Sequence, residues 1–309
     1  MQRCFEAGQF PGSFVPFLPC VDPSGGASAE LSDLGGVDPL ISSRVTGGGG
    51  ARPGHVDILD EKQASRSDIG YSLGTGGNDP DTYWDKCASV QRMFDRLLEP
   101  FPPERNPMHI MYDGLEALGA RKKRVTTAYE ERGSYGPAII RTHKPDNSDG
   151  TGHTYVPHYD SVRRREVRTG FEVFKFETQL AGILVLQAPD RIAKPGAETG
   201  DVYHDSIVYN IPADDLPGRE LTQNTALDLD VVENGGPTSG MDVHPPAFRQ
   251  FCEENPVANA PVDLEVGDMY FFKTDNVHEA PGFCGEKARS VFCTFIGYSE
   301  DEPEIFVWS

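Results

Sequence analysis

The sequence predicts a mainly β protein with flanking helices, whose core is a double-stranded β-helix of the jelly-roll, cupin-like type. Short β-like runs separated by turn residues fill the chain from Pro137 onward. Some runs alternate between apolar and polar residues and others are continuously apolar, as expected for two sheets that share one buried interface. Eight runs fit such a barrel, and they cover residues 138–143, 171–176, 180–187, 202–211, 229–232, 269–273, 290–298 and 305–308.

Two helices are expected before this core, and an irregular arm before the helices. Residues 1–75 are rich in Gly, Pro, Ser and Asp and show little periodicity. Cap and first-turn pairs at Asp79-Pro80 and Asn106-Pro107 each precede apolar residues at helical spacing, and the second helix is expected to end near Gly119. The predicted organisation is an N-terminal arm over 1–75 and a single domain over 76–309, with helices at about 79–121 and the jelly-roll core at about 137–309.

Composition excludes several classes of partner. The formal charge is 28 − 48 = −20, so a nucleic-acid partner is not expected, because the phosphate backbone would be repelled. The longest apolar run, residues 180–186, is too short to cross a bilayer, so no membrane partner is expected. The N-terminus lacks the basic and apolar regions of a signal peptide, and the six cysteines form no CxxC pair. These observations predict a cytoplasmic protein.

A candidate metal site comes from two histidines and one aspartate. His158 and Asp160 are two positions apart, so on an extended strand both side chains point to the same face. His278 follows 278 − 158 = 120 residues later and completes the ligand set of a 2-His-1-carboxylate facial triad, which is typical of iron(II) oxygenases. The alternative is a surface HxD segment at a strand end, with His278 as a turn residue. Other histidines that could replace a ligand are His143, His153, His204 and His244, the last with Asp242 two positions before it.

Two arginines are candidate anion anchors. Arg289 lies 289 − 278 = 11 positions after the distal histidine and opens a strand whose alternate residues are apolar. An arginine inside a barrel is costly unless it pairs with an anion, and its guanidinium forms a bidentate fork with a carboxylate. The alternative is that Arg289 lies at the open end of the barrel, where its strand begins, and pairs with an acidic side chain. Arg141, on the strand that enters the HxD loop, is a second candidate for a cosubstrate or substrate carboxylate.

These motifs, HxD, the distal histidine and the following arginine, resemble the Fe(II)/2-oxoglutarate-dependent dioxygenase superfamily over roughly residues 137–298. The resemblance implies Fe(II), 2-oxoglutarate and O2 as cofactor and cosubstrates, with Arg289 on the distal carboxylate of 2-oxoglutarate. It implies oxidation of an unactivated C–H bond with release of succinate and CO2, by hydroxylation, desaturation or oxidative cyclisation. No catalytic residue beyond the metal ligands is expected. Halogenation is disfavoured, because halogenases of this superfamily have Gly or Ala where this chain has Asp160.

The expected substrate is a small molecule, with carboxylate-bearing and specialised metabolites among the candidates, including those of oxidative cyclases of the kainoid-synthase kind. A protein or peptide side-chain hydroxylase is the second hypothesis. A non-catalytic cupin-type or lectin-like binding protein is the alternative from another class. The basic run at 163–168 is interpreted either as a solvated face or as a loop that recognises an anionic substrate.

Overall fold

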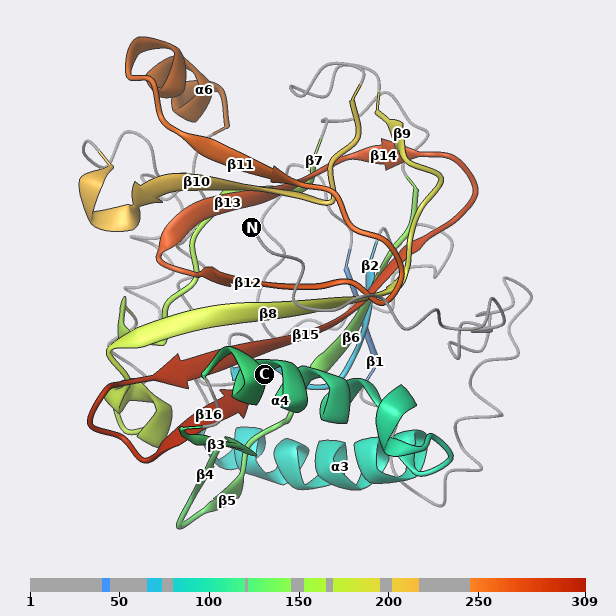
Figure 1. Cartoon of the computed structure of the whole chain (residues 1–309), viewed down its shortest axis with the longest axis vertical. Coiled ribbons are helices and arrows are strands. Elements are labelled where there is room, and N and C mark those ends of the chain that lie inside the picture. The colour runs from blue at the N-terminus through green and yellow to red at the C-terminus, as the bar shows by residue number, and fades with distance from the viewer. Residues whose placement is uncertain are drawn as a thin grey trace.

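The computed structural model describes residues 41–44, 66–73, 80–119, 122–145, 153–164, 169–194, 202–216 and 245–309, and all structural statements below concern these residues. They form two main facing sheets, antiparallel except where β16 (Glu304–Trp308) pairs parallel with β3 (Arg124–Thr127), with helices on the outer sides (Figure 1). The helices are α3 (Pro80–Leu98), α4 (Pro107–Leu118) and α6 (Pro245–Glu254), with short 3-10 turns at Pro103–Arg105, Val162–Arg164, Glu172–Lys175 and Ala213–Asp215.

Sixteen strands are present in the described part of the chain. Their bounds are β1 (Ile41–Arg44), β2 (Arg66–Ile69), β3 (Arg124–Thr127), β4 (Tyr129–Glu130), β5 (Gly133–Ser134), β6 (Ile139–His143), β7 (His153–His158), β8 (Thr178–Gln187), β9 (Ile192–Ala193), β10 (Ser206–Pro212), β11 (Asn259–Val262), β12 (Met269–Lys273), β13 (Asn276–Pro281), β14 (Phe283–Cys284), β15 (Arg289–Tyr298) and β16 (Glu304–Trp308).

The strand order is that of a jelly roll. If β6, β7, β8, β10, β11, β12, β13 and β15 are numbered first to eighth, the larger sheet contains the order 1-8-3-6. The smaller sheet has the order 2-7-4-5. Successive strands therefore wind between the two sheets, and the predicted double-stranded β-helix is confirmed.

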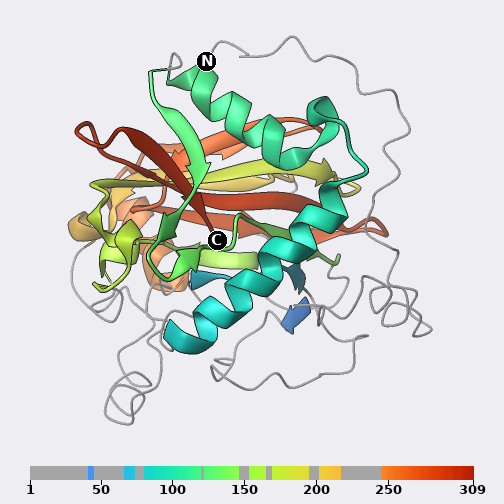
Figure 2. The ribbon, with the colours of Figure 1, turned by 90° about the horizontal axis from the view of Figure 1, so that it is seen from below.

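The outer face of the larger sheet is covered by α3 and α4, which diverge from the segment that joins them (Figure 2). Their apolar residues pack on Ile140 of β6, Leu184 of β8 and Phe292 of β15. The opposite faces of these strands are thereby left for the barrel interior, because side chains alternate along a strand. No helix in the described ranges is long and apolar enough to cross a membrane.

The second predicted helix begins where the sequence indicates. The Asn106 side chain accepts hydrogen bonds from the backbone N–H groups of Met108 and His109, and Pro107 occupies the first helical position. Asn106→Ala removes this N-cap, and we expect it to lower the free energy of unfolding by about 1 kcal/mol. Urea denaturation measures this loss, and an unchanged midpoint would show that the cap contributes nothing.

Some of the predicted elements are different in the structure. Residues 171–176, expected as a strand, contain the 3-10 turn Glu172–Lys175, because Phe171, Val173 and Phe176 pack into an aromatic cluster around Trp84 rather than into a sheet. The strand expected at 202–211 begins only at Ser206. The strand expected at 229–232 lies outside the described residues.

The irregular arm expected over residues 1–75 contains two short strands. β2 pairs antiparallel with β6, and β1 pairs antiparallel with β2, so both extend the larger sheet. The prediction of irregular structure is therefore wrong for these two segments. The pairing places Asp68 of β2 directly opposite Arg141 of β6.

Candidate metal centre

Strand pairing brings the two candidate histidines together. His158 is the last residue of β7, and His278 lies on the neighbouring strand β13 as its direct partner in the register. Such cross-strand partners have Cβ atoms about 5 Å apart and side chains on the same face. The two imidazole rings are accordingly 4.2 Å apart between centroids. The pairing of β7 with β13 therefore places side by side two histidines that are 120 residues apart in the sequence.

Asp160 completes the group from just beyond the end of β7. Its Oδ2 lies 3.7 Å from Nε2 of His158 and 3.7 Å from Nε2 of His278. Two ligands of one ion, each about 2.1 Å from it, lie at most about 4.2 Å apart, so both distances fit a shared ion. The ligand atoms of all three residues lie within 4.8 Å of one another. These residues fit a divalent metal ion in a facial arrangement.

The backbone around the site holds the carboxylate in place. The Asp160 N–H donates to the carbonyl of Thr274, in the turn between β12 and β13, at 2.8 Å. Thr274 in turn donates its N–H and its hydroxyl to the carbonyl of Gln179 on β8, each at 3.1 Å. The Gln179 side chain accepts from the N–H of Val162 at 2.8 Å. Both ends of the segment that carries Asp160 are therefore tied to strands of the barrel.

The hydrogen bonding of His278 selects the nitrogen that can bind a metal. Its Nδ1 lies 2.9 Å from the carbonyl oxygen of Asn276. A carbonyl oxygen only accepts, so the proton is on Nδ1 and the lone pair is on Nε2, which faces Asp160. A backbone acceptor behind a histidine ligand fixes its tautomer and ring orientation.

The other histidines considered as ligands lie elsewhere. His204 pairs with Asp263 through Nδ1 at 2.9 Å. His143 is buried on β6 and lies edge-on to Tyr155, with ring centroids 6.0 Å apart. The side chain of His153, and both Asp242 and His244, lie outside the described residues.

Arg289 is buried at the start of β15 and contacts an acidic partner. Its Nε lies 3.3 Å from Oδ1 of Asp205, and its side chain is 7% exposed. Burial alone would lower the pKa of Arg289, but Tyr270, Tyr203 and Asp205 together raise it above its ordinary value, so it is a permanent cation. Arg289 thus pairs with an acidic side chain, as the alternative interpretation expected. Asp205 contacts the guanidinium at its Nε atom.

Asp205 was missed by sequence reasoning. It is buried and accepts hydrogen bonds from the Tyr203 hydroxyl at 2.9 Å and the Leu264 N–H at 2.9 Å. Its signal in the sequence is a carboxylate inside the apolar run 202–211, because a buried charge in such a run requires a cation or several hydrogen-bond donors.

Arg141 faces the same interior from β6. Its Nε and Nη2 donate to the two carboxylate oxygens of Asp68 at 3.0 and 3.2 Å, in a bidentate pair. Its guanidinium lies over the Tyr155 ring, 5.6 Å from the centroid. Burial opposes the charged form, but Asp68, Tyr155 and Cys293 raise the pKa of Arg141 well above its ordinary value. The structure thus brings both predicted arginines to the barrel interior, each with an aspartate.

Aromatic rings stand behind the two histidines. The Tyr155 ring lies 4.9 Å from the His158 ring, and the Phe272 ring lies edge-on to His278 at 4.6 Å. Deeper in the barrel, Val185 and Val291 form an apolar cluster with neighbouring strands. The two aromatic rings pack against the imidazoles and restrict their rotation.

The strand that carries His278 is also fixed from its outer side. Glu279 points away from the metal centre, is 1% exposed, and accepts a hydrogen bond from Arg249 of α6 at 2.6 Å. Arg249→Met removes the cation beside this buried carboxylate, and we expect the free energy of unfolding to fall by about 3 kcal/mol, the lower end for a broken buried pair because Arg249 is partly exposed. Chemical denaturation measures the change. The matched change Arg124→Met, in an ion pair whose arginine is 69% exposed, is expected to cost much less, because solvent screens exposed pairs. An equal loss in both variants would contradict this role for Arg249.

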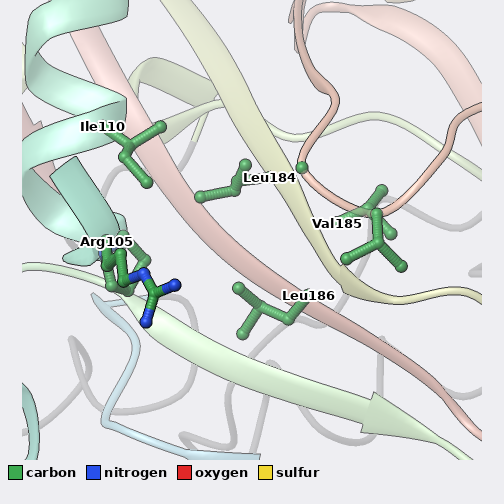
Figure 3. A pocket seen from close by; sticks show the side chains of 8 residues that line it. Arg105, Ile110, Leu184, Val185 and Leu186 are labelled. Atoms are coloured by element: carbon green, nitrogen blue, oxygen red, sulfur yellow. The ribbon is translucent and has the colours of Figure 1, made fainter. Parts of the chain in front are cut away.

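Two further features lie apart from the three ligand residues. Arg163, at the start of the basic run 163–168, is exposed, and residues 165–168 lie outside the described ranges. A pocket on the helix-covered side is lined by Arg105, Pro107, Ile110, Leu184, Val185, Leu186, Val266 and Gly267, with Arg105 extending from the α4 side toward β8 (Figure 3). It contains none of the candidate metal ligands or anchors.

Comparison with known proteins finds similarity in structure only. No protein-family model matches the chain, and no curated protein matches it. The chain is similar to an N-substituted L-amino acid dioxygenase from Burkholderia ambifaria AMMD, at 17% identity over 87% of this chain and 98% of that one, with a TM-score of 0.39. It is also similar to the non-heme alpha ketoglutarate dependent carbocyclase SnoK of nogalamycin biosynthesis, at 13% identity over 86% of this chain and 81% of that one, with a TM-score of 0.32.

A third similar structure is the epimerase SnoN in complex with Fe3+, alpha ketoglutarate and nogalamycin RO, at 12% identity over 77% of this chain and 68% of that one, with a TM-score of 0.35. The SnoN and SnoK structures are of enzymes that use alpha ketoglutarate, the class that the sequence motifs resemble. The strand order defines the jelly roll, and the positions of His158, Asp160 and His278 define the candidate metal centre.

Proposed function

We propose that this protein is an Fe(II)- and 2-oxoglutarate-dependent oxygenase that oxidises an unactivated C–H bond of a small molecule. The observation that carries the proposal is the convergence of His158, His278 and Asp160 at the end of β7, with 3.7 Å between the carboxylate and each imidazole. A buried arginine, Arg289, stands on the adjoining larger sheet as the anchor for an anionic cosubstrate.

Each of these residues has a distinct task. When bound, iron and 2-oxoglutarate supply the oxidising chemistry, in which O2 is reduced and the keto acid is converted to succinate and CO2. Nε2 of His158, Nε2 of His278 and a carboxylate oxygen of Asp160 would hold the ion on one face and leave the opposite face open. Arg289 would bind the distal carboxylate of 2-oxoglutarate and so orient its keto acid end toward the ion.

The preference for a small molecule rests on where the charged groups lie. Both candidate anchors, Arg141 and Arg289, are inside the barrel, beside strands that also carry apolar and aromatic walls. A peptide substrate would need recognition along a surface, so we place protein side-chain hydroxylation second. Hydroxylation, desaturation and cyclisation all begin with removal of one hydrogen atom, and the substrate decides among them.

We also propose that the protein works in the cytoplasm. A reducing compartment keeps iron divalent and thiols reduced. The cysteines in the described part of the chain, Cys87, Cys252, Cys284 and Cys293, are free thiols, which suits such a compartment.

An anaerobic titration tests the proposed chemistry. Addition of Fe(II) and then 2-oxoglutarate should give the weak visible charge-transfer band of the chelate, at a stoichiometry of about one iron per chain, as one facial triad requires. His278→Ala should lose the band, whereas His204→Ala, in the exposed pair with Asp263, should retain it. A colourless parent protein would instead support a non-catalytic cupin-type or lectin-like binding protein.

A further inference from the structure

Within the described part of the chain, the barrel interior contains one arginine more than the cosubstrate needs. Arg289 suffices for the distal carboxylate of 2-oxoglutarate, yet Arg141 also points inward, from the next strand in the larger sheet. The two differ in accessibility, because the Arg141 side chain is 23% exposed and the Arg289 side chain is 7% exposed. Arg141 is therefore the cation that a second ligand can reach.

The pairing of Arg141 with Asp68 leaves one edge of its guanidinium available by geometry. The carboxylate meets Nε and Nη2, which form the side edge of the group. A guanidinium has five N–H donors, and its end edge presents one from each Nη atom in the spacing of a carboxylate. Asp68 thus fixes the plane of the guanidinium while the end edge is turned away from it.

Stability alone is a weak reason for this pair. Replacing a buried ion pair with well-packed apolar residues is often neutral or stabilising, so stability does not by itself account for this pair. A purely structural role would be to tie β2 to β6, which the backbone ladder between the two strands already does.

The position of Arg141 points to the metal centre. Its guanidinium lies over the Tyr155 ring at 5.6 Å, and that ring lies 4.9 Å from the ring of His158. An anion on Arg141 would therefore have an aromatic surface between it and a candidate iron ligand. A small carboxylic acid held there would place its carbon skeleton along Tyr155, on the side of the barrel where His158 lies.

We propose that Arg141 binds the carboxylate of the small-molecule substrate, with Asp68 as its positioning residue and Tyr155 as the surface beside the substrate. This inference rests on the proposed function and names its substrate class: carboxylic acids, in place of neutral molecules. It also gives the β2 strand a task, since that strand brings Asp68 to the barrel.

Ligand-observed NMR tests the assignment with benzoate as the probe and benzamide as its neutral counterpart. The protein is saturated with Mn(II), which relaxes nearby protons and occupies the same type of ligand set, and with 2-oxoglutarate, which occupies Arg289. The same protein with Zn(II) gives the diamagnetic reference. We expect excess relaxation of the benzoate ring protons by Mn(II), at a dissociation constant of about 1 mM as befits a small fragment, and at least a tenfold smaller effect on benzamide.

Three variants separate recognition from structure. Arg141→Met should reduce the benzoate effect at least tenfold, and the double variant Arg141→Met/Asp68→Asn should do the same without leaving a buried charge beside an apolar side chain. Arg141→Lys should retain part of it, because the charge remains and the fork is lost. Equal relaxation of benzoate in parent and double variant, equal relaxation of benzamide and benzoate, or no benzoate effect in the parent would each overturn the assignment.

The 2-oxoglutarate affinity in the same variants keeps this failure distinct from failure of the proposed function. If the parent forms the iron chelate but benzoate does not depend on Arg141, only the substrate assignment falls. If Arg141→Met abolishes binding of 2-oxoglutarate, Arg141 serves the cosubstrate and the assignment is overturned. If the parent forms no chelate with Fe(II) and 2-oxoglutarate, the proposed function itself fails.

Discussion

Asp160→Gly is expected to lower 2-oxoglutarate-dependent succinate release by roughly a hundredfold or more, since a displaced or missing group at a reacting centre costs about this much. The substitution removes the anionic ligand that lies 3.7 Å from both imidazoles. Iron affinity should fall but need not vanish, because His158, His278 and the 2-oxoglutarate chelate remain. Succinate release under air, with Fe(II) and 2-oxoglutarate saturating, is the measurement.

Two comparisons sharpen this test. Asp160→Glu keeps the charge but lengthens the side chain by one methylene, and should also lose most activity because a facial ligand set tolerates little displacement. Asp263→Gly, the same change at an exposed aspartate in the His204 pair, should leave the rate close to that of the parent. Near-parental succinate release by Asp160→Gly would show that Asp160 is not an essential ligand, and the carboxylate would then be sought at Asp242.

The elements predicted best are those whose sequence pattern has a single physical reading. Asn106-Pro107 joins a side-chain cap to a residue preset for the first helical turn, and α4 begins at Pro107. β15 carries apolar residues on both faces because α3 and α4 cover one side and the barrel interior the other. A ten-residue strand that is buried on both faces has a long, mostly apolar sequence, and such a sequence predicts the strand directly.

The strands that carry the ligands were harder to predict than the ligands themselves. β13 reads Asn-Val-His-Glu-Ala-Pro and contains polar residues on both faces, because His278 faces the metal centre while Glu279 pairs with Arg249 on the outer side. The alternation of apolar and polar residues that identifies a strand is lost when both faces of the strand carry charged or polar side chains. The strand predicted at residues 171–176 was wrong for the opposite reason. The apolar spacing of this segment suits a strand, but its packing into the aromatic cluster with Trp84 and Tyr135 favours a 3-10 turn.

Long-range acidic partners could not be predicted from local sequence. Asp68 lies in a segment without hydrophobic periodicity. It forms an ion pair with Arg141 only because β2 pairs with β6. Asp205 reaches Arg289 across 289 − 205 = 84 positions. The sequence identifies which side chains need an opposite charge, whereas the sheet order decides which one each of them receives.

Arg289→Ala is expected to weaken 2-oxoglutarate binding by on the order of a hundredfold or more, because loss of a buried charge partner typically costs about 3–5 kcal/mol. Binding of Fe(II) should change far less, since no guanidinium is a metal ligand and none of the three ligand residues changes. Arg289→Lys keeps the charge but loses the planar fork, so it should bind 2-oxoglutarate more tightly than the alanine variant and less tightly than the parent. The surface change Arg124→Ala is the control and should alter neither affinity.

Anaerobic titration of each variant gives both constants, with the iron measured alone and the keto acid measured by its visible band. Circular dichroism of each variant shows whether the fold survives, because Arg289→Ala also removes the cation beside the buried Asp205. If a folded alanine variant binds 2-oxoglutarate as tightly as the parent does, Arg289 is not the anchor and its pairing with Asp205 is structural. Among the described residues, Arg141 would then be the remaining interior arginine for the cosubstrate. Its assignment to a substrate carboxylate would fall as well, since one guanidinium edge cannot hold both.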